Sequence, residues 1–359
     1  MFKTSPQRKF GVRTKIIQLL STALLLSLVG LTGCGGDEEK APDVSDVKVD
    51  LKTYRFDKDL AAIDTNNVGG SLAQLQQKYP QFLNFYLDTL MGFGILGNYS
   101  NDNPAVSTVF RPYLLHKDYR GLFDTVAKHY PDTKEIDEQL TKGFKYLKHY
   151  LPSTKEPKVM YMITWLGNWA AITYEDMLGI GLDMFLGPQY PYYKSRNIPD
   201  YMTAKMTKEY IPVAVFRAIY QDKAPFKMEG ANMLDMMIQR GKELYFLGKV
   251  LPFLPEHLRL AYTSEQLEWC KQNEGQVYNF FVQENLLYDN NWQKILRYVN
   301  DGPSSAGMAP ESPGNTGSWI GLQIVKAYMA QHSDMTLEQL MKERKDAQRF
   351  LQESRYKPK

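Results

Sequence analysis

The sequence is poor in the residues that most often hold metals or close disulfides. Only Cys34 and Cys270 occur among the 359 residues, so no disulfide framework can be predicted. No two of the five histidines are four residues apart, which excludes the H-E-x-x-H helix of a zinc peptidase. A G-x-S-x-G nucleophile elbow and a Walker loop are also missing. We therefore expect no cofactor, no metal site and no catalytic residue.

Long hydrophobic runs are also scarce, and the one that exists lies near the start of the chain. Ile16 to Val29 is mostly Leu, Ile, Val and Ala, and it follows a segment with five Lys and Arg residues and no acidic residue. Fourteen residues are too few to span a hydrocarbon layer of ~30 Å comfortably. A basic start followed by a short apolar core is typical of a secretory signal peptide. We assign residues 1–33 to this signal.

The signal ends in Leu31-Thr32-Gly33-Cys34, which resembles a bacterial lipobox. In a lipobox the cysteine thiol receives a diacylglycerol before cleavage, so Cys34 is the predicted lipidation site. Two or three acyl chains such as palmitate, at ~0.8 kcal/mol per buried methylene, hold a protein stably on a membrane. A chance cysteine behind an ordinary signal is the alternative. Residues 34–46 would form a flexible tether, and the acidic cluster within Gly35 to Lys40 fits either a cell-surface export signal or a solvated linker.

The charge of the mature chain argues against nucleic acid as a partner. The whole sequence has a net charge of +3, but residues 34–359 hold 38 Lys and Arg against 40 Asp and Glu, which gives −2. The electrostatic attraction to phosphate is therefore missing. The sequence has no internal repeat and no convincing domain boundary after residue 47, so residues 47–359 are expected to fold as a single domain.

The hydrophobic patterns predict a helix-rich α+β domain with one small sheet. Period-2 alternation or short apolar runs predict strands at 47–56, 159–164, 170–174 and 177–182, with the first strand paired to the others. Helical periodicity covers 71–91 (bent at Pro80), 118–130, 135–151, 201–220, 230–247, 264–287, 290–300, 319–330 and 337–353.

Three residues stand out as candidates for a cleft. Asp183 ends an apolar strand, where a side chain either projects into a cleft or caps a turn. Arg217 and Arg240 lie in apolar helical stretches, so each guanidinium needs a partner. That partner is either an internal carboxylate or the carboxylate of a ligand.

Two aromatic features are also candidates for binding. Tyr192 belongs to the aromatic loop 188–193, which either packs or binds a glycan. The loop 301–318 is rich in Gly, Pro and Ser and precedes Trp319. Long loops of this kind are often functional or mobile.

With these residues in view, the chain resembles the gliding-motility lipoprotein family GldB over about residues 47–359. The resemblance rests on a set of motifs spread along the chain: Tyr54-Arg55-Phe56-Asp57, Tyr79-Pro80-x-Phe82, Gly179 to Gly187, Leu234 to Phe246, Ser312-Pro313-Gly314, Gly317 to Val325 and Ser354 to Pro358. It implies a membrane-anchored envelope lipoprotein, facing the periplasm or the cell surface, that works with the gliding and secretion machinery. It implies no reaction.

The chain is also similar to a family of zinc peptidases in the order of its helices. The H-E-x-x-H of that family falls here on Phe216, Arg217 and Tyr220, and its later glutamate falls on Arg240. None of these side chains provides the imidazole or carboxylate that zinc requires. The similarity implies a zincin-like scaffold that has lost its metal.

We therefore expect a lipid-anchored, non-catalytic envelope protein whose former cleft recognises a partner, with loop 301–318 and Trp319 at the cleft edge. A hydrolase that acts on peptide or cell-wall material through Asp183 is one alternative. A surface lipoprotein that binds glycans through Tyr192 is another.

Overall fold

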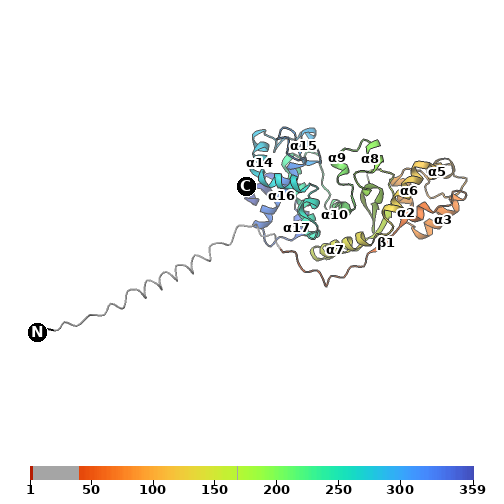
Figure 1. Ribbon diagram of the computed structural model, residues 1–359, viewed down its shortest axis with the longest axis horizontal. Helices are drawn as coiled ribbons and strands as arrows, with labels where there is room; N and C mark the ends of the chain where they lie inside the picture. Colours follow the sequence, from red (N-terminus) through yellow and green to blue (C-terminus); the bar gives the residue numbers. More distant parts are fainter. Residues whose placement is uncertain (3–39, 168) are drawn as a thin grey trace. The chain divides into compact units, whose positions relative to one another are not determined.

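The computed structural model describes residues 1–2, 40–167 and 169–359 (Figure 1). The chain divides into two units, Met1–Pro42 and Asp43–Lys359, and the following description concerns the second. The predicted signal peptide and the lipidation site Cys34 lie outside the described residues.

The packed unit begins earlier than the sequence predicts. Val44 is buried in the core, and the Lys145 ammonium donates a hydrogen bond to the Ser45 carbonyl at 3.2 Å. Lys148 likewise reaches the Lys48 carbonyl at 3.1 Å. Residues 43–46, which the sequence assigns to the end of the tether, thus belong to the unit Asp43–Lys359.

A four-stranded mixed sheet lies in the middle of the chain, as the sequence predicts. Its strands are β1 (Lys52–Tyr54), β2 (Lys158–Met162), β3 (Ala171–Tyr174) and β4 (Met177–Gly181), in the order β1-β2-β4-β3. β1 and β4 each pair parallel to β2, and β3 closes an antiparallel hairpin on β4. The predicted pairing of the first strand is confirmed, although that strand covers only three residues.

Helices precede and follow the sheet, which confirms the predicted α+β class. Those before it are α2 (Phe56–Ala61), α3 (Val68–Lys78), α4 (Phe82–Asn84), η1 (Phe85–Leu90), η2 (Ala105–Phe110), α5 (Arg111–Leu115), α6 (Lys117–His129) and α7 (Lys134–Tyr150). The single helix predicted over 71–91 is divided at Tyr79–Gln81, where Pro80 lacks the N–H that would continue it. The helices over 105–115 are not predicted.

Those after the sheet are η3 (Leu182–Phe185), α8 (Pro191–Ser195), α9 (Asp200–Thr203), η4 (Lys208–Tyr210), α10 (Ile211–Lys223), α11 (Met233–Val250), α12 (Glu256–Arg259), α13 (Ser264–Gln272), α14 (Glu274–Gln283), α15 (Trp292–Val299), α16 (Thr316–Gln331), α17 (Leu337–Lys342) and α18 (Ala347–Ser354). Figure 1 shows α10 between the sheet and the helices nearest the C-terminus. The predicted helices over 201–220, 264–287 and 337–353 are each interrupted by a turn.

Helices α11 and α16 cross in direct backbone contact. A Cβ atom built on Gly241 would lie 2.2 Å from the Gly321 carbonyl oxygen, and one built on Gly321 would lie 1.7 Å from the Met237 carbonyl oxygen. Only glycine permits such an approach. Arg240 directly precedes Gly241 on α11. The crossing therefore holds the first turn of α16 beside Arg240.

The loop between α15 and α16 is closely packed. Ser305, which is 2% exposed, hydrogen-bonds through its hydroxyl to the Pro313 carbonyl at 2.8 Å and lies 2.7 Å from the Thr316 hydroxyl. Tyr298 donates to the Ala306 carbonyl at 2.9 Å, and Tyr262 donates to the Asn315 carbonyl at 3.0 Å. These bonds fix the loop against the body of the protein.

Candidate functional site

The two predicted arginines meet at one buried carboxylate. Glu243 of α11 is 6% exposed, and its Oε1 lies 2.7 Å from Arg217 Nε of α10. Its other oxygen, Oε2, accepts a hydrogen bond from Arg240 Nη1 at 3.2 Å. The Arg217 contact is an ion pair without hydrogen-bond alignment. The internal partner predicted for each arginine therefore exists, and it is the same residue for both.

The local sequence explains how these side chains come together. Arg240 and Glu243 are three residues apart on α11 and share one face of that helix. Phe216, next to Arg217, is fully buried and packs against Phe144 of α7. Gly143 makes room for the Phe216 ring, because a Cβ there would lie 2.4 Å from it. Burial of Phe216 on one side of α10 leaves Arg217 partly exposed beside α11.

Both guanidinium groups line a cavity of about 330 Å³. The cavity is bounded by α9, α10, α11, the end of α15 and the start of α16, through Tyr201, Met202, Arg217, Arg240, Glu243, Leu244, Val299, Asn300, Asp301, Asn315 and Ser318. Arg217 and Arg240 are about one third exposed, so they face both the buried glutamate and the cavity. The structure therefore fits both alternatives, an internal ion pair and a charged pocket.

The charges at this pocket sum to a positive value. Asp301 is neutralised by Lys205, whose Nζ lies 2.8 Å from Asp301 Oδ1. Burial lowers the pKa of Lys205, and the positive charge of Arg217 lowers it further against the opposing effect of Asp301. The remaining groups are two guanidinium ions and one glutamate. The site is thus left with one uncompensated positive charge.

The first turn of α16 lies beside the same pocket, which Asn315 and Ser318 line. Asn315 is the N-cap residue in a left-handed conformation, and its side chain makes no capping hydrogen bond. The backbone N–H groups of Thr316, Gly317 and Ser318 have no partner among the described residues. A free helix N-terminus carries partial positive charge and favours anions. Sequence reasoning misses this feature because it places the start of the helix at Trp319.

Trp319 does not form the edge of the cleft. It lies inside α16 and is only 2% exposed, and it is absent from the lining of the pocket. The neighbouring residues Asn315 and Ser318 line the pocket instead. Trp319 is therefore part of the core side of α16, which begins three residues before it.

Asp183 caps a turn, which was the alternative to projecting into a cleft. It is fully buried in η3, and its carboxylate accepts the N–H groups of Thr164 at 2.8 Å and Leu166 at 2.7 Å. These bonds hold the turn after β2, where Trp165 and Leu166 both have positive φ. Burial raises the pKa of Asp183 to about 6, against the opposing effect of these hydrogen bonds. Asp183 does not line the Arg217–Arg240 pocket.

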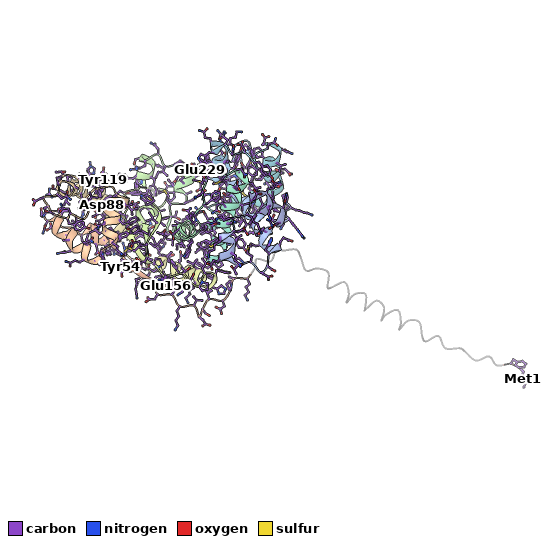
Figure 2. The ribbon with its side chains drawn as sticks, turned by 180° about the vertical axis from the view of Figure 1, so that it is seen from behind. Met1, Tyr54, Asp88, Tyr119, Glu156 and Glu229 are labelled. Atoms are coloured by element: carbon purple, nitrogen blue, oxygen red, sulfur yellow. The ribbon has the colours of Figure 1, made fainter. Side chains whose placement is uncertain are left out.

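Tyr192 lies outside the pocket as well. It belongs to the short helix α8, is 42% exposed, and its hydroxyl lies 3.4 Å from Asp118 Oδ1 at the start of α6. Tyr119, the neighbour of Asp118, lies in Figure 2 at the end of the unit away from the C-terminal helices. The proposed glycan role of Tyr192 is therefore separate from the arginine site and stays a prediction.

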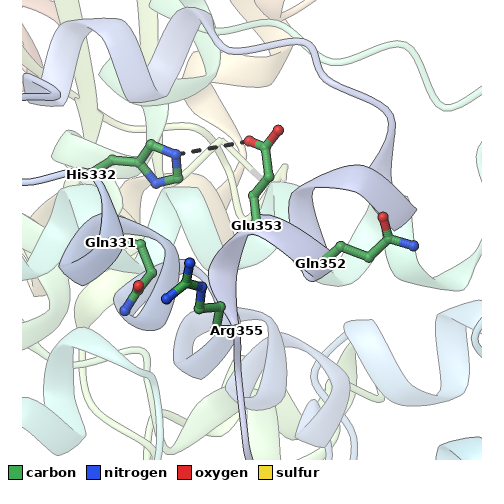
Figure 3. Close-up of a pocket in the computed structure, with 5 residues that line it drawn as sticks. All are labelled: Gln331, His332, Gln352, Glu353 and Arg355. Carbon is green, nitrogen blue, oxygen red and sulfur yellow. Dashed lines mark ion pairs between the residues drawn. The ribbon is translucent and has the colours of Figure 1, made fainter.

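A second cavity, of about 380 Å³, lies between the ends of α16 and α18 (Figure 3). Gln331, His332, Gln352, Glu353 and Arg355 line it. Glu353 already accepts from Lys345 and Arg349 at 2.8 Å, and His332 Nε2 lies 3.8 Å away. The Glu353 carboxylate already has three basic partners. We therefore consider this cavity part of a surface ion-pair network.

The described residues contain no group of three or more His, Cys, Asp and Glu side chains placed to hold a metal ion. Among the positions that resemble the zinc-peptidase motif, Phe216 and Tyr220 are buried in the core, and Arg217 and Arg240 bind Glu243. Among the residues that the structure describes, no helix is long and apolar enough to cross a membrane. Cys270 is buried, and burial raises the pKa of its thiol to about 12.

Comparison with known proteins identifies the family. No curated protein and no solved structure matches the chain. A model of the family described as gliding motility protein GldB matches residues 37–358, which is most of the 359-residue chain. The resemblance seen in the sequence motifs is thereby confirmed, and the chain belongs to the GldB family of lipoproteins involved in gliding motility.

Proposed function

We propose that this protein is held on an envelope membrane by acyl chains on Cys34 and supports gliding and the associated secretion machinery by binding another envelope protein, without catalysis. The lipobox-like segment Leu31 to Cys34 supports the anchor. Family membership supports the role in gliding. The binding partner would contact the Arg217–Arg240 pocket.

One observation carries the proposal for this pocket: two guanidinium groups share a single buried carboxylate. One arginine would neutralise Glu243, and the second leaves a positive charge facing the cavity. Both oxygens of this carboxylate already contact an arginine, so Glu243 is engaged within the protein and the guanidinium groups are the charges that face the cavity.

The role of the pocket is best tested by photo-cross-linking in gliding cells. A photoreactive amino acid in place of Met202, which is 45% exposed and lines the pocket, should capture an envelope protein. Met228 is similarly exposed at 51% but does not line the pocket, so it is the matched control. The Met202 adduct should disappear in an R217Q/R240Q/E243Q background, which leaves no carboxylate buried without a partner. Equal capture from both positions would contradict the proposal.

Anchoring is tested separately by gliding of cells that carry Cys34→Ser as their only copy. We expect the variant to accumulate without lipid and the cells to lose gliding, while Cys270→Ser cells glide normally. Cys270 is the matched control because it is the other cysteine of the chain and is buried. Normal gliding with unlipidated protein would refute the anchoring role.

A further inference from the structure

We propose that the Arg217–Arg240 pocket binds the C-terminal carboxylate of a peptide chain that ends in an apolar residue. The proposal rests on the recognition function inferred above and names the chemistry of the ligand. Its basis is the set of unpaired donors, the net charge, the size of the cavity and the apolar side chains beside the arginines.

The pocket holds more hydrogen-bond donors than the protein uses. Arg240 Nε is buried without a hydrogen-bond partner, and Arg240 Nη2 is also unpaired among the described residues. Neither Nη nitrogen of Arg217 has an acceptor among the described residues either. Ser318 in the first turn of α16 also lines the pocket, and its backbone N–H has no partner among the described residues. Arg240 Nε is the buried donor of this set, and buried donors are rarely left without acceptors in a folded protein, so the arrangement favours an acceptor-rich ligand.

The net charge selects a monoanion. With Lys205 paired to Asp301, and Glu243 between Arg217 and Arg240, one positive charge remains. A carboxylate compensates this charge, whereas a phosphate dianion would leave an excess negative charge in a partly buried site. Guanidinium groups also match a planar carboxylate in geometry.

The size and lining of the cavity favour a chain end. About 330 Å³ is the volume of roughly ten water molecules and lies at the lower end of ligand sites. This volume suits a terminal residue rather than a larger ligand. Met202, Leu244 and Val299 supply apolar surface next to the guanidinium groups, where an apolar last side chain can pack. Helix N-termini and backbone N–H groups are known elements of terminal-carboxylate recognition.

The test uses the mature chain with Cys34→Ser, which prevents lipidation, and acetyl-Ala-Leu as the probe. Calorimetric titration should show binding of the free acid. Binding of acetyl-Ala-Leu amide should be at least tenfold weaker, because the amide has no charge. Inorganic phosphate should bind more weakly than the acid. Equal binding of acid and amide, no binding of the acid, or tighter binding of phosphate would each overturn the proposal.

The variants are chosen to keep the protein folded. Removing both arginines would leave Glu243 buried without a partner, so R217Q/R240Q/E243Q replaces the whole triad by neutral amides. We expect this variant to keep the circular dichroism of the parent and to lose binding of the acid at least tenfold. Arg349→Gln removes an arginine that pairs with Glu353 outside the pocket and should bind normally. Undiminished binding by a folded triple variant would overturn the proposal. If the triple variant does not fold, Arg240→Lys is measured instead. This variant keeps the charge but loses the guanidinium group, so it must bind the acid more weakly, and equal binding would overturn the proposal.

Failure of this inference is distinguishable from failure of the proposed function. Loss of gliding in R217Q/R240Q/E243Q cells without carboxylate binding in vitro would reject the ligand and retain the recognition role. Carboxylate binding with normal gliding of the triple variant would retain the ligand and reject the role in gliding.

Discussion

The contact between α11 and α16 predicts that Gly321→Ala destabilises the protein, although alanine is the better helix former. In an exposed helix the change from Gly to Ala stabilises by about 1 kcal/mol. At Gly321 the new Cβ would lie 1.7 Å from the Met237 carbonyl oxygen, whereas ordinary contact begins at 3.4 Å. The obstacle is a helix backbone, which cannot rotate away as a side chain would. The two helices must therefore move apart by an amount on the order of 1.7 Å.

The expected cost follows from this displacement. Forcing extra atoms into a packed core costs about 1–3 kcal/mol. Here the separation also loosens Trp319, Ile320 and Met237, which are buried along the crossing. After subtracting the helix-propensity gain of about 1 kcal/mol, we expect a net loss of up to about 2 kcal/mol. Gly241→Ala should behave in the same way, because its Cβ would lie 2.2 Å from the Gly321 carbonyl oxygen.

Urea unfolding followed by circular dichroism measures this effect, and the chain offers two matched controls. A Cβ atom on Gly121 in α6 would meet nothing within 4 Å, so Gly121→Ala should stabilise by about 0.5–1 kcal/mol. Gly248 lies on α11 itself, and a Cβ there would meet only Arg259 Nη1 at 3.5 Å, so Gly248→Ala should be near neutral or stabilising. If Gly321→Ala proves as stable as Gly121→Ala, the close crossing and the position it gives to the α16 N-terminus are refuted.

Two buried charges give further predictions. Asp183→Asn should lower the free energy of unfolding by about 1–3 kcal/mol, because the amide cannot accept both N–H groups of the turn after β2; Asp176→Asn, on an exposed ion pair, should change it by less than about 1 kcal/mol in the same urea titration. Burial lowers the pKa of Lys242 from 10.5 to about 8, so the folded state loses its proton first and stability should rise with pH between 8 and 10.5. Lys242→Met should abolish a rise on the order of 2 kcal/mol between pH 7.5 and 9.5, and identical pH profiles for parent and variant would refute the assignment.

The sequence predicts the sheet well because its strands carry local signals. The apolar runs that become β2 and β4 are buried along nearly their whole length, and Glu175-Asp176 forms the turn of the β3–β4 hairpin. The boundaries of long helices are harder to predict, since a chain can turn between two helical segments without losing its periodicity. The break at Asn273, between α13 and α14, has no proline or glycine at its centre. There tertiary packing, rather than local propensity, ends the helix.

The candidate site could be predicted only in part. The need of Arg217 and Arg240 for a partner follows from their apolar surroundings, and the three-residue spacing of Arg240 and Glu243 could have named that partner. The meeting of Arg217 with the same carboxylate depends on the packing of α10 on α11, which no local pattern encodes. Composition also misplaces the start of α16, because Thr316-Gly317-Ser318 has the composition of a loop and the structure of a helical turn.

The arrangement of the triad is difficult to explain by stability alone. A buried ion pair contributes little or nothing to stability relative to apolar residues of similar size, because desolvation offsets the Coulombic gain. A second arginine on the same carboxylate adds a further partly desolvated charge, and the free N-terminus of α16 places more positive potential beside it. Each of these features raises the free energy of the folded protein with an empty pocket, and each would stabilise a bound carboxylate. The α11–α16 glycine crossing keeps them together, so the scaffold and the binding chemistry are coupled at Arg240 and Gly241.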